Sequence, residues 1–600
     1  MSEDHRATGE DERNVRDEVS RRTFLRLGAI AGAGAPLAGL LGSPAARAAT
    51  AAAAEDVEIE AAHGSFTVVE TSIADLQAAM TRGRVTSLDL VNQYLDRIAK
   101  LDQGGPRVNS VLELNPDARQ IARSLDAERK AHHVRGPLHG IPVMLKGNID
   151  TGDKMSTTAG SLALLGPPAP QDATVAARLR AAGAVILGKT NLSEWANFRG
   201  NNSTSGWSGQ GGQTGNPYVL DRNPCGSSSG SGASATASFV AAGLGTETDG
   251  SIVCPASLNG VVGIKPTVGL TSRAGVIPIS HTQDTVGPHA RTVADAAAIL
   301  SALVGVDPRD PATAASAGKF STDYTQFLDP NGLQGARIGV WRHTTTGYSR
   351  ETDAIFESAL KAMSDAGAIL VDPADIPTVD ALNATSDEIT VLIYEFKRDL
   401  NAYLATRTGL QVHTLADIIA FNNAHASQEL QYFGQELFEL AEADPFSAQD
   451  YAAALADGKR LAATEGIDAI LAAKSLDALV APTGSPAWTT DLVNGDHFTG
   501  ASSGPSAVAG YPIVNVLGGY SFGVLPVGIS FFGTAFSEGK LIKLAYSFEQ
   551  HTRLRKPPAF LRTLPTPGHA STKSLATTRV EDLLDRLSSP AAARPLPRYL

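Results

Sequence analysis

Two short stretches rich in glycine and serine decide how this sequence is interpreted: Pro224-Cys-Gly-Ser-Ser-Ser-Gly-Ser-Gly232 and Gly245-Thr-Glu-Thr-Asp-Gly-Ser-Ile252. Clustered glycine and serine are also typical of flexible linkers. Here, however, apolar segments alternate with the two stretches, and Ser251 directly precedes Ile252-Val-Cys-Pro255. Successive backbone N–H groups of a glycine-rich turn can converge on an anion. Ser251, at the end of such a turn, could therefore attack a carbonyl carbon while the turn receives the carbonyl oxygen.

A serine nucleophile needs a base, and two familiar patterns do not supply one. Gly226-Ser-Ser-Ser-Gly230 matches the G-x-S-x-G nucleophile elbow, which must follow a strand, but Asn223-Pro-Cys225 is typical of a loop. Ser358-Ala-Leu-Lys361 matches an S-x-x-K pattern within an amphipathic helical segment, where a solvated face is the simpler interpretation. The 13 histidines include no H-E-x-x-H pair, so the sequence predicts no catalytic metal.

Lys146 is the third candidate for the base. It follows the apolar segment Ile141-Pro-Val-Met-Leu145, which predicts a short buried strand. A lysine at the end of a strand is usually solvated, but partial burial would lower its pKa and let it act as a neutral base. A serine of the first stretch would then carry the proton between Lys146 and Ser251.

Composition limits the class of protein. The 600 residues include 50 basic and 62 acidic ones, which gives a net charge of -12 and argues against a nucleic-acid partner. The mean hydropathy of -0.05 leaves no room for several membrane spans. The two cysteines, Cys225 and Cys254, cannot form a disulfide scaffold. We expect them to be small thiols packed beside the glycine-rich turns, and a single disulfide is the alternative.

Residues 1–48 predict a signal peptide for the twin-arginine pathway. Ser20-Arg-Arg-Thr-Phe-Leu-Arg26 precedes the weakly apolar run Leu27–Gly42, and Ala46-Arg-Ala48 offers small residues for cleavage. The run is shorter than the ~20 residues that span a membrane, so we expect no stable anchor. The precursor would then have the twin-arginine export machinery as a partner. The mature chain, from about Ala49, would act in the periplasm or outside the cell.

Strands alternate with helices in the rest of the chain, which predicts a mixed α/β sheet covered by helices on both faces. The predicted strands are Ile141–Lys146, Ala184–Leu187, Val261–Ile264, Ala336–Trp341, Asp477–Ala481 and Leu525–Phe532. The predicted helices include Ser87–Ile98, Ala233–Ala242, Val293–Leu303, Glu351–Asp365 and much of 385–472. We expect a leader at 49–70, a single large catalytic domain at 71–565 and a polar C-terminal tail at 566–600.

These residues resemble the amidase-signature family. The resemblance rests on the block Gly226–Gly269, on the strand that ends in Lys146 and on Gly136-Pro-Leu-His-Gly-Ile-Pro142, and it extends from about Thr71 to Phe560. Within the family, Thr190-Asn-Leu-Ser-Glu-Trp-Ala-Asn-Phe-Arg-Gly200 is similar to the peptide amidases, which remove the C-terminal carboxamide of peptides. The resemblance implies a large mixed, twisted sheet and an amide hydrolase that needs no cofactor.

The resemblance also implies a Ser–cisSer–Lys triad. Ser251 corresponds to the nucleophile, Ser227 to the bridging serine and Lys146 to the base. The peptide bond between Gly226 and Ser227 should be cis. The oxyanion hole would consist of the backbone N–H groups of Thr248, Asp249, Gly250 and Ser251.

Two residues depart from the family pattern. Most members continue the lysine with Asp-Asn, whereas Gly147 stands here, so another carboxylate would have to support the lysine. Asp153 and Asp249 are the candidates. Asp249 itself replaces the glycine of most relatives, and peptide amidases resemble this chain in having aspartate there.

Several neighbouring side chains have both a functional and a structural interpretation. Aromatic residues would line the acyl pocket or belong to the core, namely Trp195, Phe198 and Trp207. Asp284 and Arg291 would support the catalytic residues without touching substrate, or they would form a surface ion pair. Asn191 and Asn197 would orient the long loop or cap turns.

The predicted function is an exported amidase that acts on small peptide amides and releases ammonia. One alternative is a broader amidase acting on aliphatic, aryl or fatty amides. Another is an exported, inactive binding protein of the same fold, which Gly147 favours and the three retained site residues oppose. An aminoacyl-tRNA amidotransferase subunit shares the fold, but the export signal and the acidic composition argue against tRNA.

Overall fold

The computed structural model describes residues 66–565. The predicted signal at 1–48, residues 49–65 of the predicted leader and the predicted tail at 566–600 lie outside these residues. Of the described residues, 66–562 belong to one compact unit. No helix among the described residues combines the length and the apolar character that crossing a bilayer requires.

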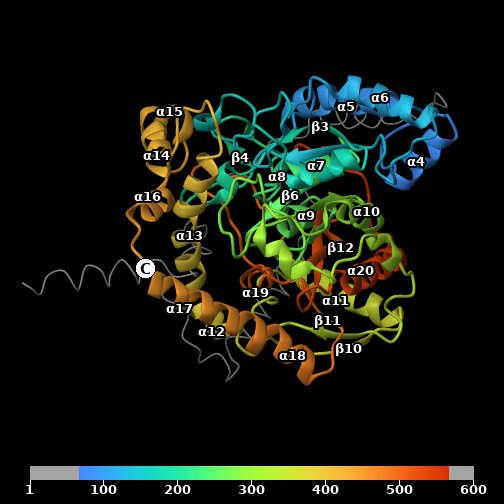
Figure 1. Cartoon of the computed structure of the whole chain (residues 1–600). Helices are drawn as coiled ribbons and strands as arrows, with labels where there is room; N and C mark the ends of the chain where they lie inside the picture. The colour runs from blue at the N-terminus through green and yellow to red at the C-terminus, as the bar shows by residue number, and fades with distance from the viewer. Residues whose placement is uncertain (1–65, 566–600) are drawn as a thin grey trace, which may run out of the picture. The chain divides into compact units, whose positions relative to one another are not determined.

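A large mixed sheet forms the centre of this unit (Figure 1). Its strands are β1 (Val111–Leu114), β2 (Pro142–Lys146), β3 (Val185–Thr190), β6 (Ala242–Glu247), β7 (Val262–Lys265), β8 (Thr285–Ala290), β9 (Arg337–Val340), β10 (Ile369–Val371), β11 (Ala478–Pro482), β12 (Ile513–Ser521) and β13 (Leu525–Phe532). They are ordered β1-β3-β2-β6-β8-β7-β12-β13-β11-β9-β10. Strand β2 runs parallel to both of its neighbours, β3 and β6. A separate ribbon pairs β4 (Trp207–Ser208) with β5 (Gly212–Gln213).

Helices surround the sheet. They are α4 (Ile73–Thr81), α5 (Ser87–Arg97), α6 (Ala118–Lys130), α7 (Thr174–Ala181), α8 (Ser229–Thr236), α9 (Val253–Leu258), α10 (Val293–Leu303), α11 (Arg350–Asp365), α12 (Val379–Ala384), α13 (Asp387–Leu404), α14 (Leu415–Ala424), α15 (Ala426–Glu429), α16 (Glu436–Ala443), α17 (Ala448–Lys459), α18 (Asp468–Ala473), α19 (Gly504–Ala509) and α20 (Glu538–Thr552). Helices α13 to α16 lie together at one side of Figure 1, and α13, α14 and α16 share a second apolar cluster with the loop around Trp195.

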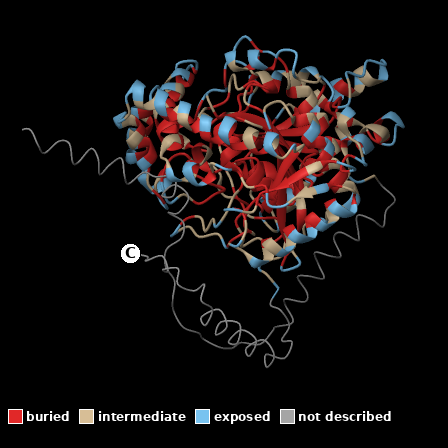
Figure 2. Cartoon of the chain, turned by 90° about the horizontal axis from the view of Figure 1, so that it is seen from below, coloured by how far each residue is buried: buried red, intermediate tan, exposed pale blue. Residues whose placement is uncertain are grey.

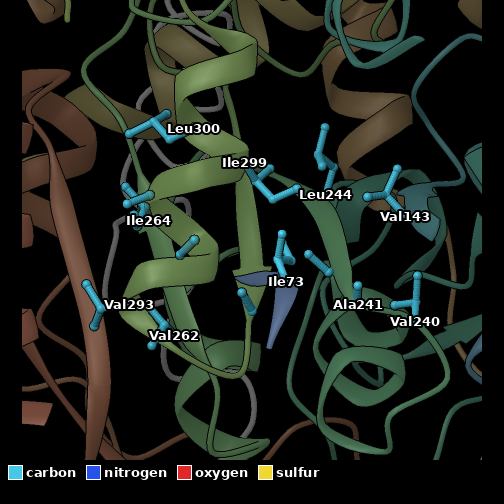
Figure 3. Packing of buried hydrophobic residues seen from close by; sticks show 14 of the residues in the cluster. Ile73, Val143, Val240, Ala241, Leu244, Val262, Ile264, Val293, Ile299 and Leu300 are labelled. Carbon is cyan, nitrogen blue, oxygen red and sulfur yellow. The ribbon is translucent and has the colours of Figure 1, made fainter. Parts of the chain in front are cut away.

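Strand β6 has helices on both of its faces because its residues alternate in size. A Cβ atom at Gly243 would lie 3.0 Å from the Ser231 carbonyl oxygen, so the glycine face lets α8 approach closely. Leu244, on the opposite face, belongs to the main core together with Ile299 and Leu300 of α10 (Figure 3). Buried residues accordingly line the sheet, and the exposed ones lie mainly on the outer helices (Figure 2). The prediction of a mixed sheet between helices is confirmed.

The predicted helices and strands are found, most of them with shifted ends. The prediction for the region after the first glycine-rich stretch was partly wrong. The expected helix Ala233–Ala242 is shorter and begins earlier, as α8, and Ala242 starts strand β6. Alanine and glycine have little strand propensity, and β6 is a strand because it lies buried between two neighbours. Helix α10 matches its predicted bounds. The residues after Ser251 form helix α9, and strands β8 and β12 were not predicted.

Candidate active site

Lys146 is the last residue of β2 and is fully buried. Its Nζ atom lies 2.7 Å from Ser227 Oγ, 2.9 Å from Thr246 Oγ1 and 3.3 Å from the Thr246 carbonyl oxygen. Burial disfavours the ammonium form and lowers the pKa of Lys146 to about 7, against the opposing charges of Asp284 and Glu247. Near neutral pH a substantial share of this lysine is therefore uncharged.

Ser227 lies in the loop that leads into α8 and is fully buried. The Gly226–Ser227 peptide bond is cis, as the resemblance implied. A Cβ atom at Gly226 would collide with Ser193 Oγ, so any other residue would require the Ser193 side chain to move. The Ser227 carbonyl accepts a hydrogen bond from the Ser193 backbone N–H at 3.0 Å. Ser227 Oγ accepts the hydrogen bond from Lys146 Nζ and donates to no acceptor among residues 66–565, so its own proton is uncommitted.

Ser251 ends the turn between β6 and α9, and this turn has open hydrogen-bond donors. The backbone N–H groups of Thr248, Gly250 and Ser251 donate to no acceptor within the described part of the chain. Gly250 has a φ of +79°, a conformation that favours glycine. Glu247 fixes the far side of the turn, since its carboxylate accepts the N–H groups of Ile252 (2.7 Å) and Val253 (3.0 Å). The turn therefore has the chemistry of an anion-binding site.

The structure brings Lys146, Ser227 and Ser251 together. Among the described residues, however, no hydrogen bond joins Ser227 Oγ to Ser251 Oγ. The two turns meet instead through the Ser228 N–H, which donates to the Ser251 carbonyl at 3.2 Å. Thr246, which sequence reasoning missed, supports Lys146 from β6. Thr246 lies in β6, the strand next to β2, and because this strand was not predicted the sequence held no signal for the contact.

The carboxylates that influence Lys146 are not those expected from the sequence. Asp153 pairs with Arg180 at 2.5 Å, and Asp249 accepts a hydrogen bond from Ser503 Oγ. Asp284 and Glu247 supply the negative charge near the lysine instead. Sequence reasoning chose Asp153 and Asp249 because they lie close to the motifs along the chain, whereas Asp284 comes from the residues just before β8.

Asp284 links the oxyanion turn to the loop that precedes β8. Its carboxylate accepts hydrogen bonds from Thr248 Oγ1 at 2.6 Å and from the backbone N–H groups of Ile279 and Ser280 at 2.8 and 3.0 Å. Burial raises the pKa of Asp284 to about 6. Asp284 does not pair with Arg291, whose guanidinium binds three backbone carbonyls, so the surface ion pair is wrong.

Gly147 is buried where a larger side chain would force its neighbours to shift. A Cβ atom there would lie 3.0 Å from Leu112 Cδ2, 3.2 Å from Leu192 Cδ2 and 3.3 Å from the Thr190 carbonyl oxygen. The packing thus explains glycine at this position. Asn148, the next residue, donates to Thr246 Oγ1 at 3.1 Å and supports the same threonine that holds Lys146.

The expectation for the cysteines was wrong, because Cys225 and Cys254 form a disulfide with Cα atoms 5.9 Å apart. Their spacing along the chain gave no sign of this proximity. Close packing of α8 and α9 brings the first turn of α9 beside the loop that precedes Ser227.

The remaining predicted neighbours are mostly structural. Trp195 and Phe198 are buried in the second apolar cluster, and Trp207 packs edge-on against Tyr432 and Phe433. Asn191 orients the long loop, since its amide donates to the Gly212 carbonyl and to Thr214 Oγ1. Asn197 has a φ of 73° and so occupies a left-handed turn position. The S-x-x-K pair is a solvated face, where Lys361 pairs with Asp365.

A cavity of about 390 Å³ lies beside the site, and Asp284 is the site residue that lines it. Ser227, Ser251 and Lys146 do not line it. At its edge, among residues 66–565, His281, Glu395 and Asp399 bring possible metal ligands together. The two imidazole nitrogens face different carboxylates: Nδ1 lies 2.9 Å from Asp399 and Nε2 lies 3.4 Å from Glu395. This arrangement is that of a histidine between two carboxylates rather than of a metal centre.

The α/β sheet and this site define an amide-hydrolysing enzyme, and three comparisons agree. A crystal structure of native peptide amidase from Stenotrophomonas maltophilia is 53% identical, with a TM-score of 0.78 over 82% of this chain and 99% of that one. A complex of peptide amidase with the competitive inhibitor chymostatin is 54% identical with the same TM-score and coverage. A probable amidase from Arabidopsis thaliana is 46% identical over 83% of this chain and 93% of its own length.

The amidase family matches residues 89–542, and the chain belongs to this family. It is a hydrolase that is structurally close to peptide amidase. The similarity to amidases and to peptide amidase supports an amide-hydrolysing enzyme over an inactive binding protein of the same fold.

Proposed function

We propose that this enzyme removes the C-terminal carboxamide of peptides as ammonia, with Ser251 as nucleophile, Ser227 as bridging serine and Lys146 as base. The observation that carries the mechanism is the 2.7 Å contact between Lys146 Nζ and Ser227 Oγ in a fully buried setting. A neutral amine has two N–H donors and one lone pair. The two Thr246 oxygens can take both donors, which directs the lone pair towards the Ser227 hydroxyl.

Acylation begins when Lys146 accepts the Ser227 proton while Ser227 accepts the proton of Ser251. Ser251 Oγ attacks the amide carbon, and its electron pair forms the new C–O bond. The carbonyl oxygen becomes an oxyanion, which the open N–H groups of Thr248, Gly250 and Ser251 stabilise. The backbone N–H of Asp249 belongs to the same turn and completes the proposed oxyanion hole. The proton then returns through Ser227 to the leaving nitrogen, the C–N bond breaks, and ammonia leaves.

Deacylation uses the same groups with water as the nucleophile. Water loses a proton to the relay and attacks the ester carbon of the acyl-enzyme. The second tetrahedral intermediate collapses, Ser251 Oγ leaves and recovers its proton, and the peptide acid is released. These steps need no group beyond the named residues and water.

The peptide class of substrate is supported by the similarity to peptide amidase, a relation that extends over nearly the whole length of that protein. The test is ammonia release from a short peptide amide by the chain beginning at Ala49, with Ser251→Ala in parallel. We expect release by the wild type and none above background by the variant. Turnover of aliphatic, aryl or fatty amides without turnover of peptide amides would keep the mechanism and identify a broader amidase.

We further propose export through the twin-arginine pathway, on the basis of Arg21-Arg22 and the segment after them. A disulfide agrees with an oxidising compartment. The test is cell fractionation of the full chain and of its Arg21→Lys/Arg22→Lys variant. We expect activity outside the cytoplasm for the first and retention inside for the second. Equal distribution would contradict the proposal.

A further inference from the structure

A disulfide joins the two turns that hold the site serines. Cys225 lies two residues before Ser227, and Cys254 lies three residues after Ser251. The covalent loop closed in this way contains α8, β6 and both serines. Both half-cystines are buried, with 5% and 7% of their surface exposed, so they offer little area to a substrate.

Hydrogen bonds also join the two turns, but among the described residues none of them joins the two site hydroxyl groups. Ser228 Oγ accepts the Thr246 N–H at 3.2 Å and donates to the Thr246 carbonyl at 3.1 Å. The backbone of Ser251 is reached by the Ser228 N–H, which donates to the Ser251 carbonyl at 3.2 Å. The disulfide adds a covalent link between the segments that carry Ser227 and Ser251, so it bears on the separation of their hydroxyl groups.

We propose that Cys225 and Cys254 are positioning residues, whose disulfide keeps Ser227 Oγ within proton-transfer reach of Ser251 Oγ when substrate binds. The inference rests on the proposed function, because it assumes that a proton passes between these hydroxyls. Misplacing a reacting group by about 1 Å can cost about 100-fold in rate. We therefore expect loss of the disulfide to lower kcat by about 10- to 100-fold. KM should change less than about twofold, since substrate contacts are kept.

Reduction is a clean test because the chain has only two cysteines, so a reductant has a single target. A water-soluble phosphine takes its oxygen from water and becomes the phosphine oxide, while the disulfide becomes two thiols. Thiol titration verifies two thiols per chain before kcat, KM and the pH profile are measured. The expected result is a lower kcat with an unchanged acid midpoint, and recovery after reoxidation. A fully reduced enzyme that keeps its kcat within twofold would overturn the proposal.

The double variant Cys225→Ser/Cys254→Ser gives a second route that does not depend on access of the reductant. We expect its kcat to match that of the reduced wild type and to be insensitive to phosphine. A purely structural role predicts a lower melting temperature with normal kcat in the folded range, and that result would also overturn the proposal. Turnover by Ser251→Ala would instead refute the proposed function, so the two failures are distinguishable.

Discussion

Two buried lysines lie at the ends of neighbouring strands and have different surroundings. Lys146 pairs in register with Thr190, and Leu145 pairs with Lys189, so the two lysine side chains leave opposite faces of the sheet. Both are fully buried, and burial lowers the pKa of Lys146 to about 7 and that of Lys189 to about 8. Burial alone therefore does not distinguish a base from a structural lysine.

The hydrogen-bond partners make the difference. Lys189 Nζ donates to the Ile149 carbonyl at 2.5 Å and to Thr157 Oγ1 at 3.0 Å, and the Thr157 hydroxyl in turn donates to Ile149 at 3.4 Å. A carbonyl has no proton to give, and the threonine proton is already committed. Ser227, beside Lys146, has an uncommitted proton and lies next to the turn of Ser251. A buried lysine becomes a base where its partner can pass on a proton.

The largest expected effect comes from removing Ser251, the proposed nucleophile of the site around Lys146. Ser251→Ala should lower kcat by on the order of 10⁴- to 10⁶-fold, because the acyl-enzyme can no longer form. Ammonia release from a peptide amide measures this loss. Ser358→Ala, on an exposed helix face, is the control and should retain full activity. Comparable activity in both variants would refute the assignment of Ser251.

Exchanging each lysine for methionine tests the comparison directly. Lys146→Met should lower kcat by about 10²- to 10⁴-fold, the usual range for a general base. Lys189→Met should instead destabilise the fold by about 1–3 kcal/mol, because the Ile149 carbonyl keeps only the 3.4 Å contact with the Thr157 hydroxyl. Kinetics and thermal unfolding on both variants separate the effects. A kinetic loss in Lys189→Met as large as in Lys146→Met would break the distinction.

Asp284 should tune the base. Its negative charge raises the pKa of Lys146, so Asp284→Asn should lower that pKa and move the acid limb of the pH–rate profile to lower pH. The neutral amide at position 284 would also accept the hydrogen bond from the Thr248 hydroxyl less strongly than the carboxylate does, so a modest fall in kcat at the plateau is expected. A limb that moves to higher pH would contradict this electrostatic role.

Substitution of Gly147 should have the smallest effect on kcat and a clear effect on the free energy of unfolding. Gly147→Ala should cost about 1–3 kcal/mol of unfolding free energy through overlap with Leu112 and Leu192. Gly147→Asp should cost more, since it also buries a charge. Denaturant titration measures both. If Gly147→Asp were as stable as the wild type and more active, the usual family aspartate would have a place here after all.

Much of this site was predictable from the sequence because its backbone determinants are local. The glycine-rich turns and the strand before Lys146 are continuous segments, and the resemblance assigned their roles. Thr246, Asp284 and the disulfide were missed or misjudged because they depend on which strands and helices become neighbours. Strand β6 was not predicted for a related reason. Its small residues allow the close approach of α8, and they have little strand propensity of their own.

The pH dependence of acylation tests most directly whether neutral Lys146 is the base. Single-turnover ammonia release from a peptide amide would be followed from pH 5 to 9 for the wild type and for Lys146→Met. Lysine is protonated below its pKa, so the wild-type rate should rise with pH through a midpoint at about 7 and then level off. The variant should show a low rate without this limb. The same limb in both proteins would contradict the account, because some other group would then be the base.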